Sequence, residues 1–400
     1  MQPTRSTAFD APPDGELPVF SPMRGGPIYR ALVRLNLSGG DLEWPSRRML
    51  AVAVVTWLPL LVLAGRQPVP GGIDFLHDIE AHLRFLAAIP VLLAGEVLAQ
   101  IRFGGTVRQF VLRGIVLPRE RARYDAIVAS ARKVADSNLL DILIVVAVYT
   151  LGHWLWRSQI AIGSPTWYAT PTADGGLDLT RAGLWYAWVS LPIAQIVTFR
   201  WVARLVVWYW FLWRTSRLDL YLTATHPDNA GGLGFVGVNT MAFAPLLLSQ
   251  GIVLAGIIAN RIFFENQALA SYKVDIAGLV LFELALVLAP LTMFSPLLGR
   301  TKRDGLGLYG AVAARYVQEF EAKWARGGAP PGEPLIGSAD IQSLADMGNS
   351  FAFVRAMRWV PIGWQTVYQL AALMLAPILP LTLTAIPIEE LVDRLLKTVL

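Results

Sequence analysis

Apolar residues are concentrated in seven segments of the chain, separated by more polar stretches. The segments cover residues 49–65, 83–101, 139–156, 183–203, 240–262, 274–298 and 362–385. A helix that crosses a lipid bilayer needs about 20 mostly apolar residues, and the segments are close to this length. The pattern predicts an all-α, multi-pass transmembrane helical bundle with about seven spans.

The polar stretches between these segments are of two kinds. Residues 1–46 are rich in proline, glycine and arginine, so we expect a mostly flexible tail in which only 26–37 favours a short interfacial helix. Residues 102–138 and 299–361 instead have the pattern of amphipathic helices outside the lipid core. We therefore predict a flexible tail followed by a transmembrane helical domain, 47–400, that includes both amphipathic segments.

Composition supports a membrane protein and excludes several kinds of chemistry. The mean hydropathy is +0.49 and charged residues make up 16% of the chain, against roughly a quarter in soluble domains. The absence of cysteine excludes disulfides, thiolate metal sites and cysteine nucleophiles. We expect no cleavable signal peptide, because the chain before residue 49 is mostly polar. The net charge of +5 does not cluster on a soluble face, so we expect no nucleic-acid partner.

The distribution of basic residues predicts the orientation in the membrane. Most of the 34 lysine and arginine residues lie in the N-terminal part and in residues 102–138, 200–217 and 299–361. Basic residues are retained on the cytoplasmic side of short loops. We predict a bacterial inner (plasma) membrane protein with a cytoplasmic N-terminus and the lipid bilayer as its surroundings. Residues 386–400 lie outside, or return to the cytoplasm if the last segment, broken at Pro377 and Pro380, is re-entrant.

The connection between the fourth and fifth segments contains the stretch THPDNAGGLGFVG, residues 225–237. A proline ends the preceding helix, and the glycines allow positive φ or close backbone approach. One interpretation is a backbone nest that holds an anion or a substrate head group. The other is a tight structural turn, because the stretch lacks the phosphate-binding G-x-x-x-x-G-K-[ST] pattern. The candidate residues of this cytoplasmic loop are His226, Asp228, Asn229, Gly231, Gly232 and Gly234.

The same stretch, together with ADIQSLADMGNSFAFVRAMRWVPI at residues 339–362, resembles a family of uncharacterised bacterial multi-pass inner-membrane proteins. The resemblance extends from about residue 28 to the end of the chain. It implies a membrane location, and no activity or functional residue is carried over from it.

Polar side chains within the apolar segments form a second candidate site. Glu283 is expected near the membrane midplane, and Gln250 reaches a similar depth on an antiparallel neighbour, so the two could hydrogen-bond or share an ion. Glu96 is expected closer to the cytoplasm, while Arg200 and Arg204 share one helix face. Such groups are costly in hydrocarbon unless they face protein or water. We predict these five residues as a substrate or ion pathway; snorkelling to the head groups is the alternative for the arginines.

Signals for catalysis are weak. Asp78 and His82 could share a metal, but His77 and His82 are five residues apart, unlike the H-E-x-x-H arrangement, so we predict no metal and no cofactor. The sequence does not decide whether the protein is an enzyme, and it favours a protein that is not. The first hypothesis is a channel or transporter for a small ion or solute. The alternative is a structural or signalling membrane protein whose cytoplasmic helices bind partners or lipid head groups, and a homo-oligomer fits either.

Overall fold

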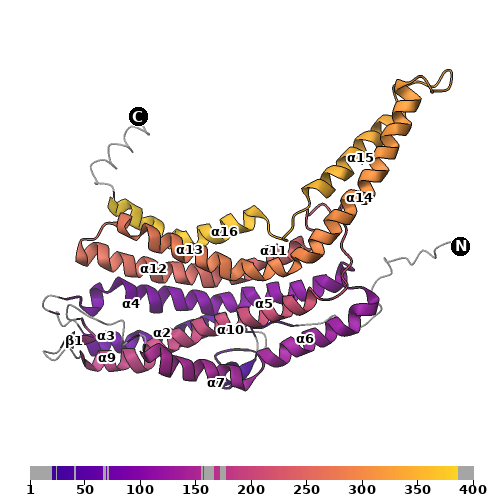
Figure 1. Cartoon of the computed structure of the whole chain (residues 1–400). Coiled ribbons are helices and arrows are strands. Elements are labelled where there is room, and N and C mark those ends of the chain that lie inside the picture. Colours follow the sequence, from indigo (N-terminus) through magenta and orange to yellow (C-terminus); the bar gives the residue numbers. More distant parts are fainter. Residues whose placement is uncertain are drawn as a thin grey trace.

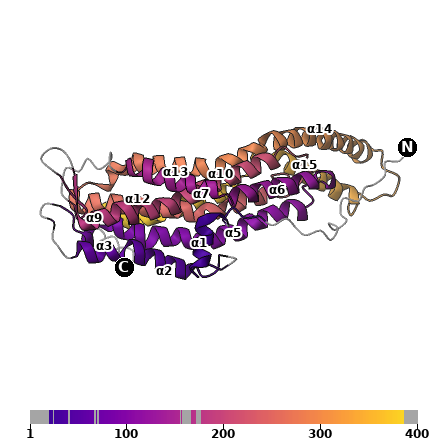
Figure 2. The same cartoon turned by 90° about the horizontal axis from the view of Figure 1, so that it is seen from below.

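The computed structural model describes residues 20–385 except 24, 40–41, 66–68, 70–71, 155, 157–165 and 172–176. The described chain is all-α apart from one antiparallel hairpin, in which β1 (Ala169–Pro171) pairs with β2 (Leu177–Leu179). The helices run side by side along the long axis of the molecule in both views (Figures 1 and 2). This architecture confirms the prediction of an all-α helical bundle.

The first half of the chain forms one face of the bundle and part of its centre. Short 3-10 or π-helical segments, labelled η, continue several of the α-helices. The elements are α1 (Gly26–Arg34), α2 (Pro45–Thr56), α3 (Leu58–Ala64), η1 (Phe75–His77), α4 (Ile79–Leu83), η2 (Arg84–Ala88), α5 (Ile89–Leu112), η3 (Pro118–Glu120), α6 (Arg121–Ala135), α7 (Asn138–Ala147), η4 (Val148–Gly152), α9 (Arg181–Trp185), η5 (Tyr186–Ser190) and α10 (Leu191–Thr215).

The second half of the chain forms the opposite face and a long projection. Its elements are α11 (Gly234–Asn239), η6 (Thr240–Phe243), α12 (Ala244–Glu265), η7 (Leu269–Tyr272), α13 (Lys273–Leu288), η8 (Ala289–Phe294), α14 (Ser295–Phe320), η9 (Glu321–Ala325), α15 (Ala339–Ala356), α16 (Trp364–Leu375) and η10 (Ala376–Ala385).

Within the described residues, six helical stretches are long and apolar enough to cross a membrane. They are Pro45–Ala64, Ile79–Leu112, Arg181–Thr215, Gly234–Glu265, Leu269–Ala325 and Trp364–Thr384. A seventh span results if Pro118–Ala135 and Asn138–Gly152, which meet at a 43° bend, are counted as one broken helix. The six or seven spans agree with the predicted number of about seven.

The centre of the bundle is built around α5, which packs against α2, α10 and α12. Buried aromatic rings connect it to the other elements near one end. The ring of Phe110 lies 5.1 Å from that of Phe235 and 6.4 Å from those of Phe211 and Phe294. Aromatic pairs at such separations contribute about 0.5–1.5 kcal/mol each beyond the area that they bury.

The N-terminal segment joins the bundle earlier than the sequence indicated. The side chains of Phe20, Met23 and Leu42 are fully buried, and α1 packs against α7. The described chain is therefore part of the bundle from Phe20 onward, ahead of the predicted boundary at residue 47. The predicted tail at residues 1–19, and the segment 386–400, lie outside the described residues.

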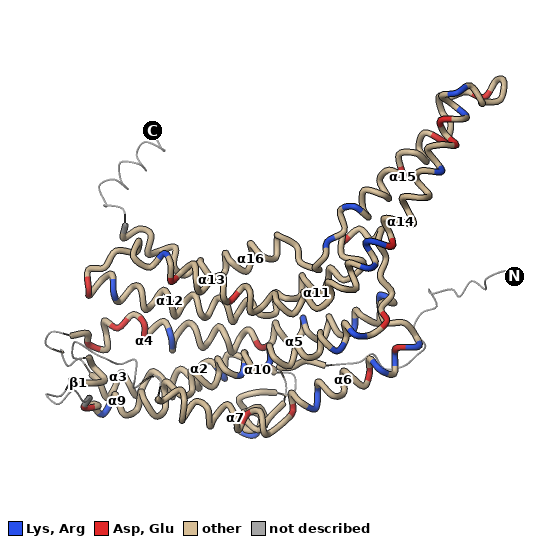
Figure 3. The backbone as a smooth tube through the Cα atoms, viewed as in Figure 1, with Lys and Arg blue, Asp and Glu red and all other residues tan. Residues whose placement is uncertain are grey.

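One hairpin extends well beyond the bundle. The helical stretch Leu269–Ala325 has 57 residues, which corresponds to about 85 Å at 1.5 Å per residue. Its second part, α14 and η9, leaves the bundle and is accompanied by the antiparallel α15 (Figure 1). We call the part of this hairpin outside the bundle the arm, and the end of the bundle from which it projects the arm end. Charged residues are frequent on the arm and at the arm end (Figure 3).

Candidate functional site

The predicted loop at residues 225–237 is wound around the carboxylate of Asp228. The Oδ1 atom accepts hydrogen bonds from the backbone amides of Ala230 at 2.8 Å and Gly232 at 3.1 Å, and Oδ2 accepts one from Gly234 at 2.8 Å. The Nδ1 atom of His226 lies 2.9 Å from Oδ1. The three amides that a nest would offer to an anion are therefore occupied by the loop's own carboxylate.

Two glycines make this winding sterically accessible. Gly231 and Gly232 have φ values of +64° and +99°, in the left-handed region that favours glycine, and Asn229 has φ of +52°. Burial raises the pKa of Asp228, but the three backbone hydrogen bonds and the nearby His226 outweigh it, so that the pKa falls below its ordinary value. The contacts correspond to the interpretation of a tight structural turn. Because these backbone amides bind the carboxylate of Asp228, they are not available to an external anion.

The loop holds the linker between α15 and α16. Arg358 donates from its backbone amide to the carbonyl of Asn229 at 2.7 Å and from Nη2 to the carbonyl of Asp228 at 2.6 Å. Its Nη1 donates to the carbonyl of Ile362 at 2.7 Å. Gly237 packs so closely on the carbonyl of Pro361 that a Cβ atom there would overlap it. The two sequence motifs at 225–237 and 339–362 are thus in direct contact.

The same linker is fixed to the first turns of α14. Lys302 donates from Nζ to the carbonyl of Met357 at 2.6 Å, and Gly299 packs beneath the ring of Trp359. Gly305 lies against Ala224, at the start of the loop. The loop, the linker and α14 therefore form one junction at the base of the arm.

Three of the predicted pathway residues meet in a buried cluster of charges. Glu96 forms an ion pair with Arg48, and their side chains are 7% and 0% exposed. Arg48 also donates to the carbonyl of Leu42 at 3.1 Å. Nearby, Nε of Arg200 lies 3.8 Å from Oδ1 of Asp141, and both side chains are buried.

The third predicted residue in the cluster, Arg204, donates from Nη1 to the carbonyl of Pro22 at 3.3 Å. Its guanidinium lies within electrostatic range of Glu96, Asp141 and Arg200. The space beside Arg200 and Arg204 measures only about 10 Å³, no more than one water molecule needs. The carboxylate of Asp141 and the carbonyl of Pro22 are thus the protein groups beside these arginines, and the buried Nε atoms of both arginines have no hydrogen-bond partner among the described residues.

Gln250 and Glu283 lie on helices that make few contacts with each other. Helix α12 packs on α4, α5, α16 and η10, whereas α13 packs mainly on α16 and the flanking η segments. Among the described residues no hydrogen bond joins the two side chains, and the buried Oε2 atom of Glu283 has no hydrogen-bond partner. Glu283 is therefore separate from the charge cluster.

Sequence reasoning missed two members of the cluster. Arg48 was not among the candidates, and Asp141 lies near a span end, where a carboxylate is unremarkable. The only sequence feature that points to Arg48 is the pair of adjacent arginines, Arg47 and Arg48, before an apolar segment. This pair does not show which of the two arginines is buried.

Asp78 and His82, at the end of the bundle opposite the arm, have structural partners. The carboxylate of Asp78 accepts hydrogen bonds from the indole of Trp167 at 2.8 Å and from the side-chain amide of Asn260 at 2.9 Å. Nδ1 of His82 accepts one from the indole of Trp57 at 2.8 Å. Within the described part of the chain, no group of three or more metal-ligating side chains is found.

No protein-family model, no curated protein and no solved structure matches the chain. The class of the protein is therefore defined by its fold. Six or seven apolar helices surround paired buried charges, and a polar hairpin projects from one end of the described bundle. These features define an all-α, multi-pass membrane protein.

Proposed function

We propose that the protein is a docking protein of the bacterial inner membrane, in which the bundle is the anchor and the arm binds a protein partner on the cytoplasmic side. The observation that carries this proposal is the continuation of a membrane span into the arm, braced by α15 and fixed at its base by the 225–237 loop. A rigid projection outside the lipid presents a surface at a fixed position relative to the bundle. Kinship with uncharacterised bacterial inner-membrane proteins is part of the same proposal.

The surface of the arm carries exposed apolar side chains. Leu308 and Val312, one turn apart on α14, are 64% and 45% exposed, and Ile341 on α15 is 45% exposed. Gly307 and Gly348 have open space where a side chain would lie. Neighbouring apolar residues such as Leu308 and Val312, on a surface outside the membrane, are typical of protein-binding sites, and glycines allow a partner helix to approach closely.

The charges of the arm favour a protein over a lipid surface as the partner. Toward the far end of the arm, acidic and basic residues form ion pairs, including Arg315 with Glu319 at 2.9 Å and Lys323 with Asp340 at 2.9 Å. Hydrogen bonds from Lys323 and Trp324 lower the pKa of Asp340. Lipid-binding segments instead carry uncompensated lysine and arginine.

The proposal is tested by site-specific photo-crosslinking in native membranes. A crosslinker at Leu308 is expected to give one discrete protein adduct. A crosslinker at Val274, which is 81% exposed near the start of α13 and far from the arm, is expected to give only lipid adducts. Val312→Glu is expected to reduce the Leu308 adduct about tenfold, because a charge in an apolar contact is costly. Gln318→Glu, the same charge change farther along α14, is the matched control. Equal yields in both variants, or no adduct at Leu308, would contradict the proposal.

A channel or transporter for a small ion or solute is the second candidate function, and Glu283 is the observation that favours it. Its side chain is buried in a membrane span, and Oε2 has no hydrogen-bond partner among the described residues. Polar groups without partners at this depth often serve ion or solute pathways.

Flux of a panel of ions and small solutes into liposomes tests this second candidate. If Glu283 takes part in transport, Glu283→Gln is expected to reduce the flux about tenfold, because the amide cannot carry the charge or the proton. Glu319→Gln, on the exposed part of the arm, removes the same charge and should leave the flux unchanged. The absence of flux with the intact protein would remove this candidate.

A further inference from the structure

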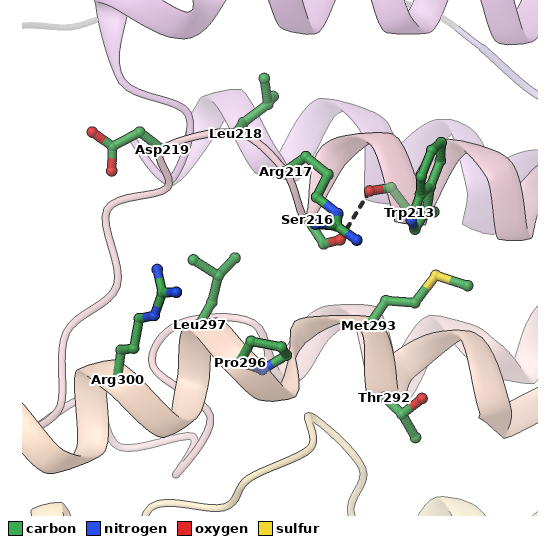
Figure 4. A pocket seen from close by; sticks show the side chains of 10 residues that line it. All are labelled: Trp213, Ser216, Arg217, Leu218, Asp219, Thr292, Met293, Pro296, Leu297 and Arg300. Carbon is green, nitrogen blue, oxygen red and sulfur yellow. Dashed lines mark hydrogen bonds between the residues drawn. The ribbon is translucent and has the colours of Figure 1, made fainter.

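A surface pocket of about 530 Å³ lies at the arm end, between the end of α10 and the η8–α14 segment. Its size is within the range of small-molecule binding sites. The lining includes Trp213, Arg217, Asp219, Met293 and Arg300 (Figure 4).

The pocket changes from apolar to charged along its length. Trp213 and Met293 lie at one end, and Asp219 and Arg300 at the other (Figure 4). Both helices run toward the arm end at this point, so that the apolar end is the one closer to the centre of the membrane spans. A phospholipid has the same polarity, with acyl chains below a charged head group.

Two arginines supply positive charge to the pocket. Arg217, in the turn just after α10, and Arg300, on α14, project into the space between the two segments (Figure 4). Neither is in an ion pair within the described part of the chain, whereas the one carboxylate of the lining, Asp219, is paired with Arg119. The Cζ atom of Arg217 lies over the ring of Trp213, 5.7 Å from the ring centre, which holds the guanidinium beside the pocket.

The aromatic residues beside the pocket indicate its level in the membrane. Arg214 stacks 5.8 Å from the ring centre of Trp210, one turn before the stack of Arg217 on Trp213. Tryptophan is enriched at the membrane–water interface, and arginine at such a position reaches the head groups. The pocket therefore opens where lipid phosphates lie.

We propose that this pocket binds the phosphate group of an anionic phospholipid through Arg217 and Arg300, with an acyl chain lying along Trp213 and Met293. Basic pockets between membrane helices are suited to phosphate head groups, because guanidinium groups form paired hydrogen bonds with phosphate oxygens. The lipid site does not depend on the proposed docking function, because it lies between the helices at the arm end rather than on the surface of the arm.

Native mass spectrometry of the full-length protein, from vesicles of phosphatidylcholine with one fifth phosphatidylglycerol, tests the site. The intact protein is expected to retain phosphatidylglycerol in preference to phosphatidylcholine. The double variant Arg217→Gln/Arg300→Gln is expected to retain it about 30-fold less, which corresponds to about 1 kcal/mol for each of the two basic residues near the surface. Arg300→Gln alone changes an exposed position and is expected to give a smaller loss of phosphatidylglycerol retention. This single variant replaces the double variant in the test if the double variant does not fold.

The matched control is Arg214→Gln/Arg303→Gln, which removes two exposed arginines of α10 and α14 that do not line the pocket. Unchanged lipid retention in the control supports a specific site. An equal loss in both double variants would instead show a general effect of surface charge and overturn the proposal. Displacement of the lipid by millimolar inorganic phosphate, or retention of both lipids alike, would also overturn it.

Discussion

Replacement of Glu96 by leucine is expected to lower the free energy of unfolding of the bundle by about 3–5 kcal/mol. The substitution leaves the guanidinium of Arg48 fully buried, with the carbonyl of Leu42 as its remaining acceptor. A buried charge without a counter-ion is among the most destabilising changes in a folded protein. Unfolding of the purified protein by dodecyl sulfate in mixed micelles measures the difference.

Two further variants distinguish the loss of a partner from the loss of a carboxylate. In Arg48→Met/Glu96→Leu both charges are replaced by apolar groups, so most of the stability is expected to return. Glu319→Leu breaks the exposed ion pair with Arg315 and is expected to cost about 0.2–1 kcal/mol. A cost for Glu96→Leu no greater than that for Glu319→Leu would show that the buried pair does not stabilise the bundle.

Asp228→Ala is expected to destabilise the junction at the base of the arm by about 2–3 kcal/mol, because three backbone amides lose a charged acceptor. Hydrogen exchange is expected to increase in residues 225–237 and in the linker that Arg358 attaches to them. His226→Ala removes only a neighbour of the carboxylate and is expected to have a smaller effect. Unchanged exchange in Asp228→Ala would contradict the structural role.

The same carboxylate predicts a dependence of stability on pH. Because the pKa of Asp228 is lower in the folded loop than its ordinary value of 3.8, its contribution is complete above that value. The contribution is lost as the pH falls through the lowered pKa of the folded loop. Asp228→Asn, which cannot ionise, is expected to show a smaller loss of stability over this acidic range. Equal slopes for the two proteins would contradict the prediction.

The sequence was a good guide to the spans, because each span must be apolar over a length that the bilayer sets. It was a poor guide to which charges meet inside the bundle. Arg47 and Arg48 are adjacent, yet Arg47 stacks on Trp44 at 4.5 Å while Arg48 is fully buried. Successive residues of a helix point about 100° apart, and the local sequence does not state which of them faces the neighbouring helix. Glu96 could therefore be recognised as a candidate, but its partner could not.

The glycine-rich loop was predicted only in part. The turn and the positive φ values follow from the residues themselves, since Asn229, Gly231 and Gly232 all adopt them. The occupation of the amides by Asp228 depends on how the backbone closes over the following six residues. The contact with Arg358 depends on tertiary structure, because it joins residues that are far apart in the sequence.

The short 3-10 segment η8 gives the arm a mechanical property. It interrupts the α-helical hydrogen bonding between α13 and α14, and such interruptions often act as hinges within long helices. From the end of η8 at Phe294 to Ala325 the helix extends about 46 Å, so a rotation of about 10° at η8 would move the far end by about 8 Å. While the junction at its base holds, the helix pair α14–α15 keeps its direction, and loss of the junction would turn small rotations at η8 into large displacements of the far end.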